Sequence, residues 1–197
     1  MNAREAVDDD WHRCFIALVP DAATRDALAA LPVGAAARPV AVEQLHMTVA
    51  FLGSIAPEKG VVLAGRLGEV VAPLPPQCAE RSEYWPSAAH PRLVVVPFAA
   101  AQGLAALEAR LRELVAGLGL PVDDHRPFRP HITLARFARS ARPAREASPG
   151  RASPRAAQPL IEATLGVVPC FDTLTLYSST LVRHGARYRA LARVSLK

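Results

Sequence analysis

Two parts of the chain repeat one order of apolar and polar positions, which predicts a strand, a helix and a second strand in each. The first part has an apolar segment at 14–19, then Asp21 as a plausible helix cap and an Ala/Leu stretch ending at Leu31. The second part has an apolar segment at 93–98, then leucines at helical spacing across 104–118. The repeat suggests an internal duplication whose halves pack about a pseudo-two-fold axis.

The end of the chain predicts two further strands, at 171–180 and 188–196, joined across residues 183–185. Leu174 and Leu176 are expected to face the core, because alternate side chains of a strand point to the same side. A short helix is expected at 159–164.

The domain prediction is one bilobal α+β unit over residues 1–197. The chain is 51% apolar, enough for a sizeable core, and no strongly polar linker divides it. Residues 73–76 are the expected junction of the lobes. Residues 139–158 combine five Arg with repeated Ser, Pro and Ala, which predicts a flexible loop.

Each predicted unit ends in the same short sequence motif, His-apolar-Thr-apolar, at 46–49 and again at 131–134. In a strand, His46 and Thr48 share one face, and His131 and Thr133 likewise share one. With six histidines and seven threonines in 197 residues, fewer than one His-x-Thr motif is expected by chance. The symmetry of the duplication would bring the two motifs face to face.

Two imidazoles across a cleft suit the cleavage of phosphodiesters without a metal. An unperturbed imidazole has a pKa near ~6.5, so one member of a pair can be a base while the other is an acid. Thr48 and Thr133 would donate hydrogen bonds to the non-bridging phosphate oxygens.

Composition narrows the partners and cofactors. The net charge of +5 favours a polyanionic partner, although much of the excess lies in the 139–155 segment. Three scattered cysteines, Cys14, Cys78 and Cys170, lack metal-ligand spacing and fit a reducing cytoplasm. No zinc-site spacing and no glycine-rich phosphate loop occur, so we expect neither a metal nor a cofactor. No signal peptide or membrane span is expected either, which predicts a cytoplasmic protein, and we expect a monomer.

These residues resemble the two-histidine (2H) phosphoesterases, and among them the RNA 2′,3′-cyclic phosphodiesterases long called 2′-5′ RNA ligases. The likeness covers FIALVPDAATRDAL, LHMTVAFLG, PRLVVVPF, RPFRPHITLARF and LTLYSSTLVRHGARYRAL. The resemblance implies a bilobal α+β fold with two sheets flanking a central cleft and helices outside. It also implies RNA ends or cyclic nucleotides as substrates.

The resemblance implies metal-independent hydrolysis of RNA 2′,3′-cyclic phosphate ends to 2′-phosphomonoesters. His46 is then the acid toward the departing 3′ oxygen and His131 the base toward water, although the residues themselves leave this direction open. Five residues after each histidine, Phe51 is expected to stack on the terminal base and Arg136 to contact phosphate. Both positions have the wrong strand parity for this, so a bulge or strand end must redirect them.

Other residues and functions stay open at this point. Two arginines flank Phe128, and they are equally compatible with lining the RNA path and with a solvated approach loop: Arg126 and Arg129. Tyr177 and Ser179 match the closing pattern of the family and could border the cleft, although Tyr177 is as readily structural. The alternative functions are reversible 2′-5′ RNA ligation, cleavage of 2′-5′-linked oligonucleotides, and a non-catalytic RNA-binding module.

Overall fold

The computed structural model describes residues 11–79, 81–122, 127–138, 168–182 and 185–196. The predicted loop at 139–158 and the predicted short helix at 159–164 lie outside the described residues.

The duplicated strand, helix and strand order is present in both parts of the chain. The first unit consists of β1 (Cys14–Pro20), α2 (Ala22–Ala29) and β3 (Met47–Gly53). The second unit consists of β5 (Leu93–Pro97), α4 (Gln102–Gly117) and β6 (His131–Phe137). Asp21 is the N-cap of α2, where its carboxylate accepts a 2.8 Å hydrogen bond from the backbone of Thr24.

The two predicted C-terminal strands are also present, as β7 (Phe171–Val182) and β8 (Gly185–Ser195). The remaining elements are the helix α3 (Pro57–Arg66) and four short ones: β2 (Ala37–Pro39), η2 (Val42–Gln44), η3 (Leu67–Val70) and β4 (Glu83–Trp85). Sequence patterns did not predict α3, because it contains Gly60 and Gly65 and exposes Val61 and Val62. Gly60 fits there because the Trp11 ring packs against its backbone.

The strands form one sheet whose two halves meet at the His-apolar-Thr-apolar motifs. The order is β4-β5-β6-β3-β1-β7-β8, with β2 also paired to β6, and neighbouring strands are antiparallel. Strands β3 and β6 are paired only through Met47 and Ile132. The two expected sheets are therefore continuous with each other, and their junction is a single residue pair at the start of both motif strands.

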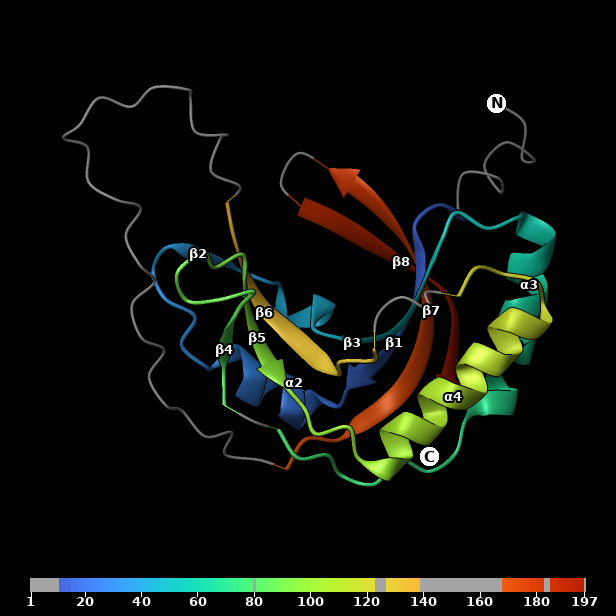
Figure 1. Ribbon diagram of the computed structural model, residues 1–197, viewed down its shortest axis with the longest axis horizontal. Coiled ribbons are helices and arrows are strands. Elements are labelled where there is room, and N and C mark those ends of the chain that lie inside the picture. Colours follow the sequence, from blue (N-terminus) through green and yellow to red (C-terminus); the bar gives the residue numbers. More distant parts are fainter. Residues whose placement is uncertain (1–10, 80, 123–126, 139–167, 183–184, 197) are drawn as a thin grey trace.

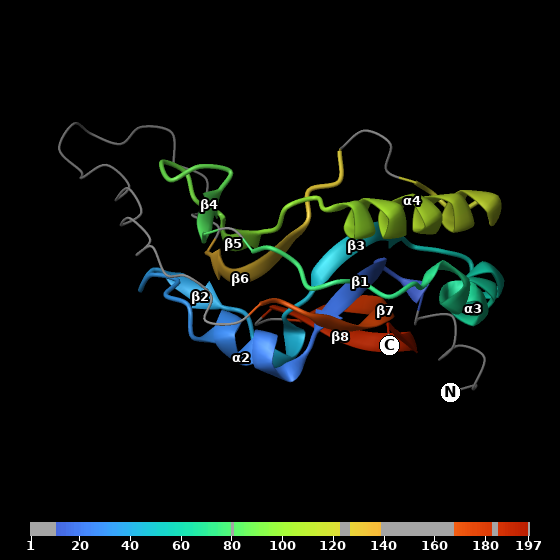
Figure 2. The same ribbon diagram turned by 90° about the horizontal axis from the view of Figure 1, so that it is seen from below.

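One face of this sheet is covered by the helices. Figure 1 shows α2 and α4 on the lower side of the sheet, and Figure 2, seen from below, shows them on either side of the central strands in roughly two-fold arrangement. Met47, Ile132, Leu174 and Leu176 are fully buried in the core formed on this side, together with apolar residues of the three α-helices in the described part of the chain. We call this side the core face.

The opposite side carries the alternate residues of the same strands, and we call it the motif face because His46, Thr48, His131 and Thr133 belong to it. Phe15, Ala17 and Val95 are buried on this face, yet they lie outside the main core cluster. The fold therefore separates the packing residues of each motif from its polar residues, as strand periodicity predicts. Among the described helices, none combines the length and apolar character needed to cross a membrane.

Candidate active site

The pairing of Met47 with Ile132 fixes how the two motifs face each other. Because the strands are antiparallel, one step along each from that pair sets His46 opposite Thr133 and Thr48 opposite His131. The two motifs thus form one four-residue group with approximate two-fold symmetry.

The two imidazoles make the same hydrogen bond. Nδ1 of His46 lies 2.7 Å from the carbonyl oxygen of Gln44, and Nδ1 of His131 lies 2.7 Å from that of Arg129. A carbonyl oxygen only accepts, so each Nδ1 must carry a proton and donate it. Each Nε2 is therefore the nitrogen left to accept or donate a proton in chemistry.

Burial lowers the pKa of both histidines. The nearby positive charge of Arg136 lowers both pKa values further, and Arg129 adds to this effect on His131. The Nδ1 hydrogen bonds act in the opposite direction, because a carbonyl acceptor stabilises the imidazolium. In the free protein at neutral pH, the neutral form of each imidazole is thus favoured.

A bulge in each motif strand turns the fifth residue after the histidine onto the motif face. The register of β1 with β3 shifts so that Val49 is passed over, and the register of β5 with β6 shifts so that Leu134 is passed over. Both are the last residue of their motif. The extra residue reverses the strand parity, so Phe51 and Arg136 join the histidines on one face. The predicted redirection is confirmed for both copies.

Aromatic rings surround His46. The ring centroids of Phe15 and Tyr188 lie 5.1 and 5.2 Å from its imidazole, and that of Tyr177 lies 6.4 Å away. Phe51 continues this group, with its centroid 6.3 Å from that of Phe15. The Phe51 side chain is 68% exposed, so most of its ring is open to a planar ligand.

His131 has a different environment, built on Trp85 of β4. The two ring centroids are 4.5 Å apart, and the indole Nε1 donates to a Glu83 carboxylate oxygen over 2.9 Å. The Arg129 guanidinium lies 4.2 Å from the Trp85 ring centroid, close enough for a cation–π interaction. Arg129, Trp85 and His131 thus form one contact group that limits the movement of the imidazole.

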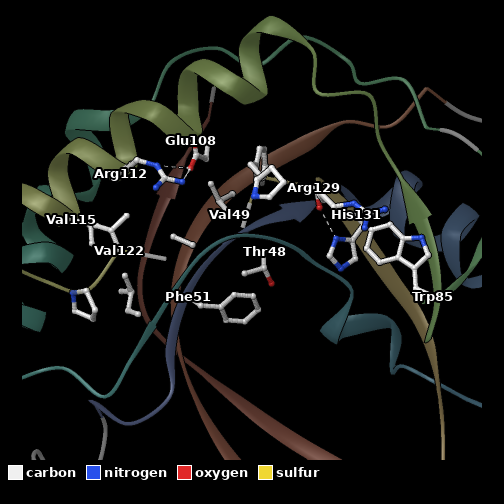
Figure 3. Close-up of a pocket in the computed structure, with 15 residues that line it drawn as sticks. Thr48, Val49, Phe51, Trp85, Glu108, Arg112, Val115, Val122, Arg129 and His131 are labelled. Atoms are coloured by element: carbon white, nitrogen blue, oxygen red, sulfur yellow. Dashed lines mark hydrogen bonds and ion pairs between the residues drawn. The ribbon is translucent and has the colours of Figure 1, made fainter. Parts of the chain in front are cut away.

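A pocket of about 560 Å³ opens at this site. Figure 3 shows His131 and Trp85 at one end, Thr48 and Phe51 in the middle, and the Glu108–Arg112 ion pair of α4 at the other end. Val49, Leu52, Val115 and Val122 give this far part an apolar lining. The pocket is large enough for a nucleotide-sized ligand.

The structure brings the six predicted site residues together. His131, Thr48 and Phe51 line the pocket, whereas strand register places His46, Thr133 and Arg136 beside them on the motif face. Among the described residues, no three His, Cys, Asp or Glu side chains gather as a metal-binding group.

Three aromatic residues of the site were missed by sequence reasoning. Trp85 lies 46 positions before His131 and reaches it only through the pairing of β4 with β5 and β5 with β6. Phe15 and Tyr188 reach His46 through strands on the other side. A signal existed for Phe15, since it alternates with the buried Ile16 and Leu18 in an adjacent predicted strand.

The fold and the paired motifs define a two-lobed α+β protein with two histidines at the junction of its lobes. A family model for the 2′-5′ RNA ligase superfamily matches residues 20–172. The RNA 2′,3′-cyclic phosphodiesterase of Escherichia coli (strain K12) is 36% identical over 107 residues, which are 54% of this chain and 58% of that protein. The sequence match thus spans less than two thirds of the relative.

Solved structures match over almost the whole chain. Escherichia coli LigT complexed with 3′-AMP superimposes with a TM-score of 0.67 at 29% identity, covering 94% of this chain and 98% of LigT. TT0787 of Thermus thermophilus superimposes with a TM-score of 0.68 at 28% identity, covering 93% of this chain and 97% of that protein. The chain belongs to the 2′-5′ RNA ligase superfamily, which confirms the family prediction.

Proposed function

We propose that this protein hydrolyses RNA 2′,3′-cyclic phosphate ends to 2′-phosphomonoesters, using His46 and His131 as a metal-independent acid and base pair. The observation that carries the proposal is the matched pair of Nδ1 hydrogen bonds, which leaves Nε2 of both histidines for proton transfer. The name of the Escherichia coli relative supports this choice of substrate. We further propose that the protein works as a monomer, and we place its activity in the cytoplasm.

The proposed reaction is one displacement at phosphorus. Nε2 of His131 accepts a proton from water as the water oxygen bonds to phosphorus. The bond from phosphorus to the 3′ oxygen breaks, and Nε2 of His46 donates its proton to that oxygen. The products are a 2′-phosphate and a free 3′ hydroxyl, and the protonation states of the two histidines are exchanged.

Thr48 and Thr133 are suited to stabilise the charge that builds up on the non-bridging oxygens. Their hydroxyls share the motif face with the imidazoles and flank the same space from opposite strands. Arg136 adds a fixed positive charge on this face, near enough to both histidines to lower their pKa values. Donors and charge arranged before the substrate arrives need no reorganisation during the reaction.

Phe51 is expected to bind the terminal base by stacking. Stacking of a base on an aromatic side chain contributes about 1–3 kcal/mol, so Phe51→Ala should raise KM by roughly five- to 150-fold with a smaller effect on kcat. Phe51→Tyr should keep most of the affinity. Because the ring is 68% exposed, the melting temperature of Phe51→Ala should stay close to that of wild type. An unchanged KM would show that the base binds elsewhere.

The pH dependence of kcat/KM follows from the lowered pKa values of the histidines. The acid must be protonated, and its pKa in the free protein is below the ordinary ~6.5, so kcat/KM should already be falling as the pH rises through ~6.5. A bound phosphodiester anion raises both pKa values, which should displace the kcat profile to higher pH.

Arg136→Gln tests the electrostatic part of this prediction. It removes a positive charge that lowers both pKa values, so the maximum of kcat/KM should move to higher pH, in addition to any loss of rate. Arg25→Gln, on α2, removes an equal charge away from the motif face and should leave the maximum in place. A maximum unmoved by Arg136→Gln would contradict the assigned position of that side chain.

The product distinguishes this proposal from its alternatives. A short RNA ending in a 2′,3′-cyclic phosphate is incubated with the protein in EDTA, and the product is identified by chromatography. We expect a 2′-phosphate. A 3′-phosphate would keep the histidine pair but exchange the leaving oxygen. A joined 2′-5′ product formed from an added 5′-hydroxyl RNA would favour ligation, and binding without turnover would favour a non-catalytic module.

A further inference from the structure

Two arginines face each other directly beside the proposed catalytic group. Strand β2 pairs with β6 in antiparallel register, and in this register Arg38 is the partner of Arg136. Directly opposed residues of antiparallel strands point to the same face, so Arg38 shares the motif face with Arg136. Both side chains are exposed to solvent.

The position of this pair along β6 places it next to the phosphate site. In the pairing of β6 with β5, the partner of Arg136 is Leu93 and the partner of Thr133 is Val95. Because Leu134 is the bulge residue, Arg136 and Thr133 are two strand positions apart. Two strand positions correspond to about 6.6 Å. The other edge of β6 pairs first with β3 and then with β2. Arg38 therefore lies on the same edge of β6 as His46, whereas Arg136 lies in β6 itself, as Thr133 does.

Like charges placed directly opposite each other destabilise a sheet. Acidic partners would remove this cost, but among the described residues neither arginine makes an ion pair or a side-chain hydrogen bond. The two guanidiniums offer planar donor groups that match the oxygens of a phosphate. A bound anion between them would turn the repulsion into a two-sided attraction.

We infer that Arg38 and Arg136 together form a second phosphate subsite, which binds the 5′ phosphate of the nucleotide whose 2′,3′-cyclic phosphate is being opened. This inference rests on the proposed function, because the cyclic phosphate must occupy the histidine pair. It makes the protein selective for the ends of RNA chains over free nucleoside cyclic phosphates. The aromatic group with Phe51 lies on the opposite side of the histidines, where the base can stack.

Binding of two unreactive nucleotides tests the subsite. Kd values for adenosine 3′-monophosphate and adenosine 3′,5′-bisphosphate are measured by calorimetry at one fixed ionic strength. A charge-assisted contact to the added phosphate should make wild type bind the bisphosphate roughly tenfold or more tightly. Arg38→Gln should lose most of this preference, and Arg38→Lys should keep part of it as a point charge. Arg25→Gln is the matched control for net charge and should keep the full preference.

The thermal stability of the free protein provides a second readout. If the pair is repulsive without a ligand, Arg38→Gln should melt at the same temperature as wild type or higher, and the bisphosphate should raise its melting temperature less. Equal affinity of wild type for the two nucleotides, or the same preference in Arg38→Gln and Arg25→Gln, would overturn the inference. Turnover of adenosine 2′,3′-cyclic phosphate by wild type tests the proposed function separately, so the two failures can be told apart.

Discussion

Replacement of either His46 or His131 by alanine is expected to lower kcat for a 2′,3′-cyclic phosphate substrate by roughly 10²- to 10⁴-fold. Each variant removes one of the two proton transfers while the other histidine keeps its hydrogen bond to the backbone. His90→Ala is the matched control, because His90 is exposed and lies outside the site. A single histidine variant with near wild-type kcat would contradict the pair.

The two histidine variants should differ when the leaving group is changed. A substrate with a p-nitrophenolate leaving group needs little protonation, so it should restore much of the rate of the acid variant but not of the base variant. On the direction proposed above, His46→Ala is the variant that recovers. Since His46 packs among aromatic rings, His46→Gln should be measured beside it to separate lost chemistry from lost packing. Recovery of His131→Ala instead would reverse the two roles.

Loss of the threonine hydroxyls is expected to have the second largest effect. Thr48→Val or Thr133→Val keeps the shape of the side chain and removes one donor to the phosphate oxygens, which should lower kcat by roughly 10²- to 10³-fold. Thr→Ser at the same positions keeps the hydroxyl and should retain most of the rate. The effect should fall on kcat more than on KM, because the charge on these oxygens grows toward the transition state.

Thr180→Val is the control for the threonine series. Thr180 lies in β7, is exposed and has no place in the motif group, so its replacement should leave kcat unchanged. A loss in Thr48→Val and Thr133→Val no larger than in this control would contradict hydrogen bonding to the phosphate oxygens.

The predicted site rests on local periodicity, which explains why so much of it could be found from sequence. Strand parity alone separates His46 and Thr48 from Met47, and the structure places Met47 in the core. The duplication then predicts the same division in the second motif, with its apolar residues in the core and its polar residues on the opposite face. Parity also predicted that a bulge or a strand end must redirect Phe51 and Arg136. The position of the bulge within each strand is known only from the strand register in the structure.

The missing parts depend on contacts between distant strands. Trp85 belongs to a three-residue strand with no periodic signal, so only the sheet order links it to His131. Arg38 belongs to another strand of three residues, Ala-Arg-Pro, in which the proline gives no indication of a strand. Both strands are short edge elements, and the information that positions them lies in the partner strands β5 and β6.

The most direct test of the paired-histidine account is the turnover of a short RNA with a 2′,3′-cyclic phosphate end, in EDTA, by wild type, the two single alanine variants and the double variant. The account expects active wild type, a loss of at least roughly 100-fold in each single variant, and a double variant little worse than the weaker single one, because the two groups act as a unit. Full activity in either single variant, or losses that multiply in the double variant, would contradict it.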